Sequence, residues 1–160
     1  MDFQIRPYSE RDQADVVELS LRAWAPVFES LQAVLGTIVF ELLHRDWRVD
    51  QRRVVDAVLA AQPSLVWVAA TGHRVAGFVA VELDQSRLLG QVYLIAVDPE
   101  YQNSGIGERL TAFALDRMKE AGMTVAMVET GGDPGHAPAR RTYEKTGFTL
   151  LPIARYFKAL

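Results

Sequence analysis

Two glycines, Gly105 and Gly107, stand where a helix is expected to begin, in the stretch "QNSGIGERL". The first N–H groups of a helix have no partner within the helix, and its N-terminus carries about half a positive charge. Glycines there let several N–H groups approach an anion, because no Cβ stands in the way. The pattern predicts a phosphate or pyrophosphate site over Gly105 and Gly107; the alternative is a tight turn without a ligand.

Two familiar nucleotide-binding patterns do not fit these glycines. A Walker loop needs Gly-x4-Gly-Lys-Ser/Thr, which the chain lacks. A Rossmann fingerprint needs a third glycine three residues after Gly107, where Leu110 stands. It also places its glycines directly after a strand, whereas here Asp98–Ser104 lie between Val97 and Gly105. The mismatches argue against an NAD-binding Rossmann protein.

The chain has few side chains that could act as a nucleophile. There is no cysteine, which excludes a thiol nucleophile, disulfides and thiolate zinc sites together. Ser104 lies inside the predicted phosphate loop with no obvious base beside it. His44, His73 and His136 have no partners at metal-ligand spacing, so no metal site is predicted. These residues therefore offer no obvious nucleophile for a covalent enzyme intermediate.

Helical spacing dominates the first third of the chain. The stretch "DFQIRP" predicts a short first strand, and an N-cap at Ser9 begins a helix that Pro26 should end or bend. A second apolar stripe of period near 3.6 runs over 31–43, and "DQRRVVDAVLAA" predicts a third helical segment that closes at Pro63.

Strand patterns follow. Three runs rich in valine and aromatic residues predict an antiparallel meander: "SLVWVAAT", "HRVAGFVAVELD" and "LLGQVYLIAV". A helix over 107–120, a strand "MTVAMVE" and a short helix "ARRTYEKT" come next, and "FTLLPIARYFKAL" predicts one or two closing strands. Together these elements indicate a single α/β domain of mixed topology over residues 1–160.

The composition of the chain limits the kinds of partner that it can bind. The chain of 160 residues has a net charge of −3, which argues against nucleic acid, because phosphate binding depends on clustered positive charge. The apolar stretches look short and interrupted, so no membrane span is expected. The N-terminus is charged from Asp2 onward and lacks the apolar core of a signal peptide, which favours a cytoplasmic protein.

Two motifs in order resemble those of one family. The pattern Val97-x-Pro99-x-x-Gln102-x-x-Gly105-x-Gly107-x-x-Leu110 resembles the coenzyme-A-binding motif of the GNAT superfamily of N-acetyltransferases. Downstream, His136-x-x-Ala139-x-x-x-Tyr143-Glu144-Lys145-x-Gly147-Phe148 is similar to the second family signature. The resemblance covers essentially the whole chain. It implies the acyl-CoA N-acyltransferase fold, a mostly antiparallel sheet splayed at strands 4 and 5 with helices on both faces.

The resemblance also implies acetyl-CoA as co-substrate. Relatives often carry arginine or lysine at the positions of Asn103 and Ser104, so phosphate binding here should depend on backbone amides. The family's usual asparagine is replaced by His136. A backbone N–H of Ala96 or Val97 is expected to polarise the thioester carbonyl. The implied coenzyme-binding residues are Ala96, Val97, Gln102, Asn103, Ser104, Gly105, Ile106, Gly107, Glu108, His136, Ala139 and Tyr143.

Catalytic roles follow from the same resemblance. Tyr143 matches the tyrosine that faces the coenzyme sulfur and would protonate the departing thiolate; its alternative role is plain packing. Glu129, at the end of a predicted strand, is the first candidate base for the acceptor amine, and Glu82 is the second. Either could instead be a solvated surface carboxylate, with a water chain sharing the task.

Three residues between the first two predicted helical segments are candidates for binding the acceptor amine. Trp24, Phe28 and Glu29 could line an apolar pocket with one negative charge, or could simply pack helix against helix. The expected reaction is acetyl transfer to a small amine or to a peptide or protein amine. The alternative from another class is a non-catalytic acyl-CoA-binding sensor on the same fold. Relatives often dimerise, so a homodimer is a further expectation.

Overall fold

One mixed sheet organises the protein. The computed structural model describes residues 2–160, and five strands lie in the order β1-β2-β3-β4-β5. Strands β1 to β4 pair antiparallel, whereas β4 and β5 pair parallel. The strands are β1 (Gln4–Pro7), β2 (Val66–Thr71), β3 (Arg74–Asp84), β4 (Leu89–Val97) and β5 (Val125–Val128). The helices are α1 (Gln13–His44), α2 (Trp47–Ala61), α3 (Ile106–Glu120) and α4 (Ala137–Lys145).

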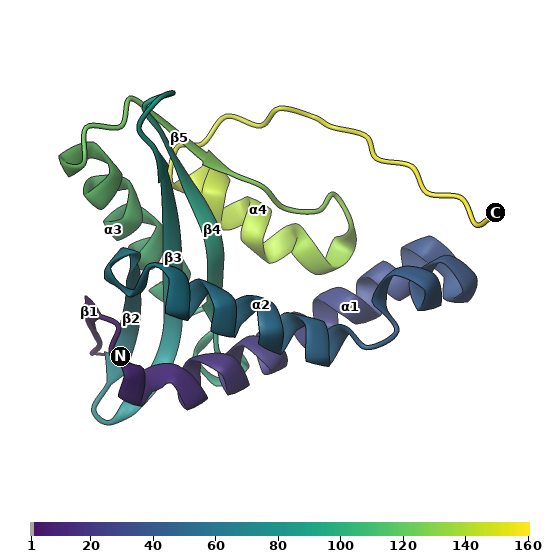
Figure 1. Ribbon diagram of the computed structural model, residues 1–160, viewed down its shortest axis with the longest axis horizontal. Coiled ribbons are helices and arrows are strands. Elements are labelled where there is room, and N and C mark those ends of the chain that lie inside the picture. Colours follow the sequence, from purple (N-terminus) through teal and green to yellow (C-terminus); the bar gives the residue numbers. More distant parts are fainter. Residues whose placement is uncertain (1) are drawn as a thin grey trace.

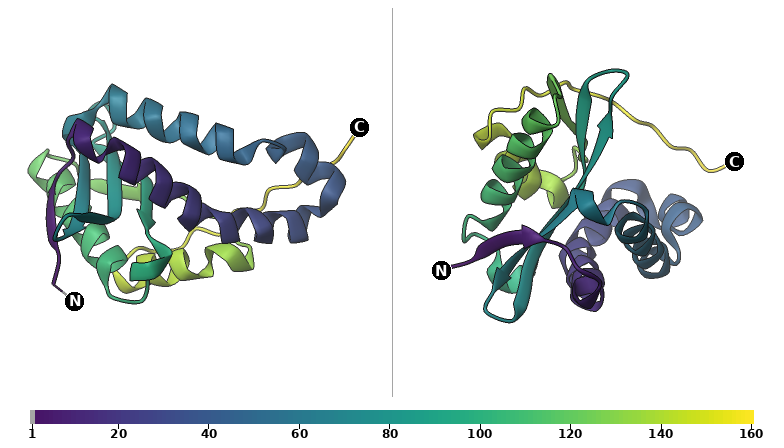
Figure 2. Two further views of the ribbon diagram at one scale, coloured as in Figure 1. Left: turned by 90° about the horizontal axis from the view of Figure 1, so that it is seen from below. Right: turned by 60° about the vertical axis from the view of Figure 1, so that its left-hand side comes forward.

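Helices cover both faces of this sheet (Figures 1 and 2). On one face α3 presents an apolar stripe with a spacing of four residues, namely Ile106, Leu110, Ala114 and Met118, all buried. On the other face α1 and α2 bury side chains such as Leu19 and Val55 against β2 and β3. Strand β3 is therefore buried without interruption over 75–81, as expected for a strand between two layers. The expected meander, sheet and helix order are confirmed.

The break in the first helix lies at Gly36 and not at Pro26. Pro26 sits inside α1, while Gly36 has φ +74° and ψ 160°, which no helical residue adopts. Proline removes one N–H and crowds the preceding turn, yet a helix can continue through it. A positive φ interrupts the helix outright and is nearly free of strain only for glycine. The residues after Gly36 resume the helix as far as His44.

The closing strands expected over 148–160 are absent from the structure. Residues 149–160 have no regular secondary structure, and no hydrogen bond joins them to the rest of residues 2–160. A strand exists only when a neighbour pairs with it, and β5, the last strand of the sheet, pairs only with β4. Local sequence preference for strand structure was therefore not enough to add a sixth strand.

One helical run, Glu10–His44, is long and apolar enough to cross a membrane by length and composition. The expectation that every apolar stretch is short was therefore wrong for this segment. A single such helix near the N-terminus is weak support for a span. Its first turns pack on the sheet with Val16 and Leu19 fully buried, whereas only 6% of its most apolar window is buried. The break at Gly36 also interrupts it.

Candidate active site

The sheet opens between β4 and β5. The two strands pair from Leu89 opposite Val125 to Val92 opposite Val128, where β5 ends. Strand β4 continues to Val97 and pairs there only with β3. The expected splay at strands 4 and 5 is thus confirmed, and the β4 edge beyond Val92 is open. An extended chain with amide groups could pair with this edge as a strand does.

The hydrogen bonds between β3 and β4 show which backbone N–H groups of β4 face the open edge. Asp98 N–H donates to the Ala76 carbonyl of β3 at 2.9 Å. Since N–H directions alternate along a strand, Ala96 N–H also faces β3, and Val97 N–H faces the opening. Of the two expected carbonyl-polarising donors, only Val97 has its N–H on the open side; its role toward a carbonyl stays a prediction. A bulge in β4 leaves Tyr93, just past the last β4–β5 pair, without a β3 partner.

Unpaired backbone donors gather where α3 begins. The first bond within this helix is Arg109 N–H to Gly105 O at 3.1 Å, so the three preceding N–H groups have no partner in the helix. Asn103 and Gly105 have φ of +60° and +82°, which turns the loop into a concave arrangement of N–H groups. These amides, of Ile106, Gly107 and Glu108, have the arrangement that the predicted anion site requires; anion binding by them stays a prediction.

Side chains of the loop hold its shape rather than project outward. The Ser104 hydroxyl donates to the Tyr101 carbonyl, and the Gln102 amide donates to the Val97 carbonyl at 3.2 Å. Ser104 is therefore not a free nucleophile, and Gln102 fastens the loop to the end of β4. An anion bound here would be held by backbone N–H groups, in agreement with the lack of a basic side chain at Asn103 and Ser104.

Gly107 leaves space for a Cβ between β4 and α4. A Cβ at this position would lie 3.7 Å from the Val97 side chain and 3.9 Å from the Thr142 side chain. These are ordinary contact distances, so a side chain would fit and would fill the gap. The absence of a Cβ at Gly107 thus leaves the start of α3 close to the Val97 and Thr142 side chains with a small space between them.

Tyr143 is presented by α4, which packs against α3. An ion pair between Lys145 and Glu108, at 2.7 Å, joins the two helices. The Tyr143 side chain is buried, and burial raises its pKa to about 12. Its ring packs edge-on against Phe148 with the centroids 6.0 Å apart. Within residues 2–160 the hydroxyl makes no hydrogen bond, so it remains protonated and available to donate.

The loop before α4 is tied to α1 through Asp133. Its carboxylate accepts from Ser30 Oγ at 2.6 Å and contacts His136 Nδ1, while Gly135 N–H donates to Ser30 at 2.8 Å. Burial raises the pKa of Asp133, but the hydrogen bonds from Ser30 and His136 outweigh it and lower the pKa. His136 is therefore engaged at one ring nitrogen, in a tether that fixes the start of α4. Ala139 is half-buried on the same helix.

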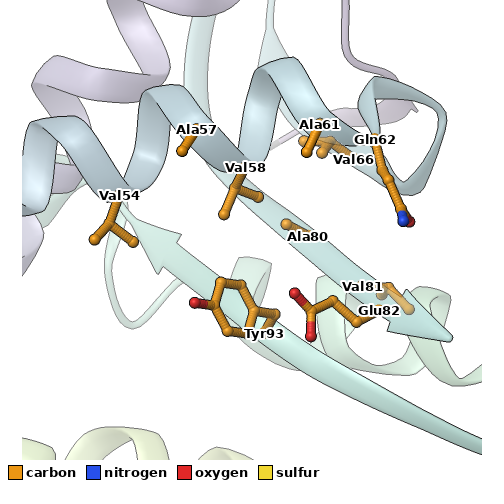
Figure 3. A pocket seen from close by; sticks show the side chains of 10 residues that line it. All are labelled: Val54, Ala57, Val58, Ala61, Gln62, Val66, Ala80, Val81, Glu82 and Tyr93. Carbon is orange, nitrogen blue, oxygen red and sulfur yellow. The ribbon is translucent and has the colours of Figure 1, made fainter. Parts of the chain in front are cut away.

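A pocket of about 290 Å³ lies between α2 and the strands β3 and β4. Figure 3 shows the Glu82 carboxylate and the Tyr93 ring on one side, with small aliphatic side chains of α2 opposite. Tyr93 belongs to the β4 bulge, so this pocket borders the point where β4 and β5 separate. It is an apolar site with one acidic side chain, which suits an organic cation or amine. The α2 residues that line it are Val54, Ala57, Val58 and Ala61.

The other acceptor candidates lie elsewhere. Phe28 stacks on Trp47 with the centroids 4.3 Å apart, and Trp24 packs against the core shared by α1, α2 and the sheet. Glu29 is exposed, and none of the three lines the pocket. Glu129 is exposed directly after β5, on the open side of the splay. Contact of these residues with an acceptor stays a prediction.

Sequence reasoning missed three residues of this region: Tyr93, Ser30 and Asp133. The strand pattern gave no sign of the bulge at Tyr93. Ser30 and Asp133 are 103 positions apart, and only the fold brings them together. The Asp-Pro dipeptide before "GHAP" was a signal for a turn, though not for its partner on α1.

Solved structures share this architecture. The PaiA N-acetyltransferase of Thermoplasma acidophilum, solved in complex with coenzyme A, superposes with a TM-score of 0.72 at 18% identity, covering 96% of this chain and 94% of that one. A GNAT family acetyltransferase of Brucella melitensis, in complex with acetyl-CoA, gives 0.64 at 21% identity, with coverage of 93% and 84%. At these identities the likeness establishes the fold.

Sequence comparison establishes the family. The model of the acetyltransferase (GNAT) family matches residues 28–148, so the chain belongs to this family. Among curated relatives, a mycothiol acetyltransferase of Kocuria rhizophila is 31% identical over 150 residues, covering 91% of this chain but 45% of that protein. The one of Thermomonospora curvata is 30% identical, covering 67% and 35%. The chain thus spans less than half the length of these relatives.

Proposed function

We propose that residues 1–160 act as one domain that transfers the acetyl group of acetyl-CoA to a primary amine. The observation that carries this proposal is the group of free amides of Ile106–Glu108 at the start of α3, next to Val97 at the open end of β4. Amides at the start of α3 suit the diphosphate of the coenzyme, and the open edge suits its extended, amide-containing arm. The complexes with coenzyme A and acetyl-CoA reported for relatives of the same fold support this assignment.

The proposed reaction is direct attack of the neutral amine on the thioester within a ternary complex. Val97 N–H polarises the thioester carbonyl, and the amine nitrogen forms a bond to its carbon. The carbon–sulfur bond then breaks, and the Tyr143 hydroxyl gives its proton to the departing thiolate. A carboxylate takes the proton that the amine loses. Glu82, in the pocket, and Glu129, beside the splay, are the two candidates for that carboxylate.

The acceptor enters, in this proposal, through the pocket that Glu82 and Tyr93 line. An alkyl or similarly apolar amine fits the aliphatic wall of α2, and its ammonium group pairs with the carboxylate. The relatives named mycothiol acetyltransferases make their acceptor the first compound to try, although the identity covers under half of their length. A homodimer and a cytoplasmic location remain predictions from the sequence.

An acetyl-CoA consumption screen over amine classes tests the proposal. We expect turnover with at least one acceptor, and calorimetric binding of coenzyme A to the purified chain. Glu82→Gln and Glu129→Gln then identify the base, because the base variant loses turnover without weaker coenzyme binding. Acetyl-CoA binding without acetylation of any acceptor would favour the acyl-CoA sensor instead. Absence of coenzyme A binding would remove both functions.

A further inference from the structure

A buried carboxylate joins the turn before α4 to the middle of α1. The Asp133 side chain is only 6% exposed and accepts a hydrogen bond of 2.6 Å from the Ser30 hydroxyl on α1. Gly135 N–H donates to the same hydroxyl at 2.8 Å, so Ser30 both donates to this turn and accepts from it. Figures 1 and 2 show the turn beside α1. We name these three residues the α1–α4 tether.

Glycines leave room for the tether. A Cβ on Gly135 would lie 2.6 Å from Ser30 Cβ, which is closer than two unbonded carbons can come. A Cβ on Gly131 would overlap the Asp133 carboxylate. At Gly132, in the same turn, a Cβ would meet nothing within 4 Å. The close approach of the turn to α1 therefore depends on particular glycines and not on glycine content as such.

The turn and α4 are fastened into one unit. The Arg140 guanidinium, from α4, donates to the backbone carbonyls of Gly131 and Asp133, the latter at 2.9 Å. His136, the residue before α4, contacts the Asp133 carboxylate through Nδ1. Tyr143 follows His136 by seven residues, almost two helical turns, so the two side chains leave α4 on the same face. A displacement of the turn is therefore passed along a short helix to Tyr143.

The tether connects α4 with the helices on the acceptor side. Within residues 2–160, the hydrogen bonds between α1 or α2 and residues 129–148 are only those that Ser30 makes. The α2 helix also forms one wall of the pocket assigned to the acceptor. The ion pair between Lys145 and Glu108 holds the other end of α4, but both side chains are exposed, so it contributes little. The tether is thus the buried polar anchor of the helix that carries the candidate acid.

We propose that Ser30 and Asp133 are positioning residues for acetyl transfer, which hold the start of α4 on α1 and thereby set the Tyr143 hydroxyl against the thioester sulfur. This inference rests on the proposed function, in which Tyr143 protonates the thiolate. Small displacements of a catalytic group cost much of its effect. Loss of the tether should therefore lower kcat about tenfold, while the coenzyme A dissociation constant changes less than about twofold, because the amides of α3 are untouched.

A double-mutant cycle tests whether the tether acts through Tyr143. Ser30→Ala should lower kcat about tenfold in the wild type but less than about twofold in Tyr143→Phe, because the group that it positions is already removed. Ser86→Ala is the matched control, since Ser86 Oγ also donates at 2.6 Å to an aspartate, Asp84, in an exposed turn. It should leave kcat unchanged in both backgrounds. An equal loss from Ser30→Ala in both backgrounds, or no loss in the wild type, overturns the proposal.

Glycine variants of the turn give an independent test. Gly135→Ala places a methyl group against Ser30 and should repeat the tenfold loss, whereas Gly132→Ala has room and should match the wild type. Equal losses from the two variants would contradict the tether. Calorimetry should give wild-type coenzyme A affinity for both variants, and an affinity loss as large as the kcat loss would contradict a role through Tyr143.

Hydrogen exchange of the α4 amides separates this inference from the proposed function, because it needs neither coenzyme nor acceptor. Exchange should become faster in Ser30→Ala and Gly135→Ala and stay unchanged in Gly132→Ala, since the start of α4 loses its anchor only in the first two. Unchanged exchange in all three variants overturns the tether. If the wild type acetylates no acceptor, the acetyl-transfer proposal fails, and the exchange rates still decide whether Ser30 holds α4.

Discussion

The Tyr143 side chain is buried as a whole, and within residues 2–160 its hydroxyl donates to no other group. We expect Tyr143→Phe to lower turnover by about 10²-fold or more, the usual size of a lost general acid, while coenzyme A affinity changes little. Steady-state kinetics with calorimetry of coenzyme binding measure the two effects. Tyr156→Phe, at an exposed tyrosine, should match the wild type. Equal loss of binding and turnover would instead assign Tyr143 a packing role.

Asp12 supplies a pH-dependent contribution to stability. Arg6 donates two hydrogen bonds of 2.7 Å to it, and Ser9 N–H donates at 2.9 Å. The bonds from Arg6, aided by those from Ser9, outweigh burial and lower the pKa of Asp12 to about 2. A carboxyl with a lowered folded-state pKa stabilises the fold above its unfolded pKa, and this contribution disappears as the pH falls from about 4 to 2.

Asp12→Asn should therefore lower the free energy of unfolding by about 2 kcal/mol at pH 7. The difference between variant and wild type should shrink below pH 4. Urea titrations at several pH values measure it. Asp15→Asn, an exposed acid in the first turn of α1, is the control and should stay within ~0.5 kcal/mol of wild type. A constant difference from pH 7 to pH 2 would contradict the assignment.

At the scale of elements, the start of α3 and the end of β4 act together. Gly107 has room for a Cβ in ordinary contact with Val97 and Thr142, whereas Gly105 has a positive φ that disfavours any side chain. Gly107→Val should therefore fill the space between Val97 and Thr142, beside the open end of β4. We expect coenzyme A to bind at least about tenfold more weakly, a loss of roughly 1.4 kcal/mol, by calorimetry.

The matched control for Gly107→Val is Ala112→Val, an exposed position of the same helix. It introduces the same β-branched residue into α3 and should bind coenzyme A like the wild type. If both variants bind equally well, the space beside Gly107 is not the coenzyme path. If both variants bind coenzyme A more weakly, the cause is a change in helix α3 and not the filled space beside Gly107.

Element boundaries show how much local pattern can predict. The apolar spacing of α3 and the valine-rich runs of β2 to β4 were enough to predict these elements. Each of them buries side chains in the core at the regular spacing of a helix or a strand. The break of α1 was assigned to Pro26 since proline within a helix removes one backbone hydrogen bond and crowds the preceding turn. Gly36 carries no such local signature, because a glycine inside a helix can also keep helical φ and ψ. The turn towards α2 is what requires its positive φ.

For the whole molecule, coenzyme binding and stability should be linked. A ligand at 100 times its dissociation constant stabilises the folded state by about 2.7 kcal/mol. For a domain of this size that corresponds to a rise in melting temperature of roughly 5–10 °C. Calorimetric melting with and without coenzyme A measures it. Tyr143→Phe should keep the rise and Gly107→Val should lose most of it; the opposite order would contradict the placement of the coenzyme.

The sequence by itself indicated the family and nearly all elements, and it located the candidate anion site at Gly105–Gly107 and the candidate acid Tyr143. These features are recorded locally, as residue spacing within a few turns or a single strand. The tertiary structure alone decided that Val97 and not Ala96 faces the opening, because that depends on pairing with β3. It also brought Ser30 to Asp133 and left the residues of 149–160 unpaired. Strand pairing and long-range contacts are properties of two segments at once, so no single stretch of the chain encodes them.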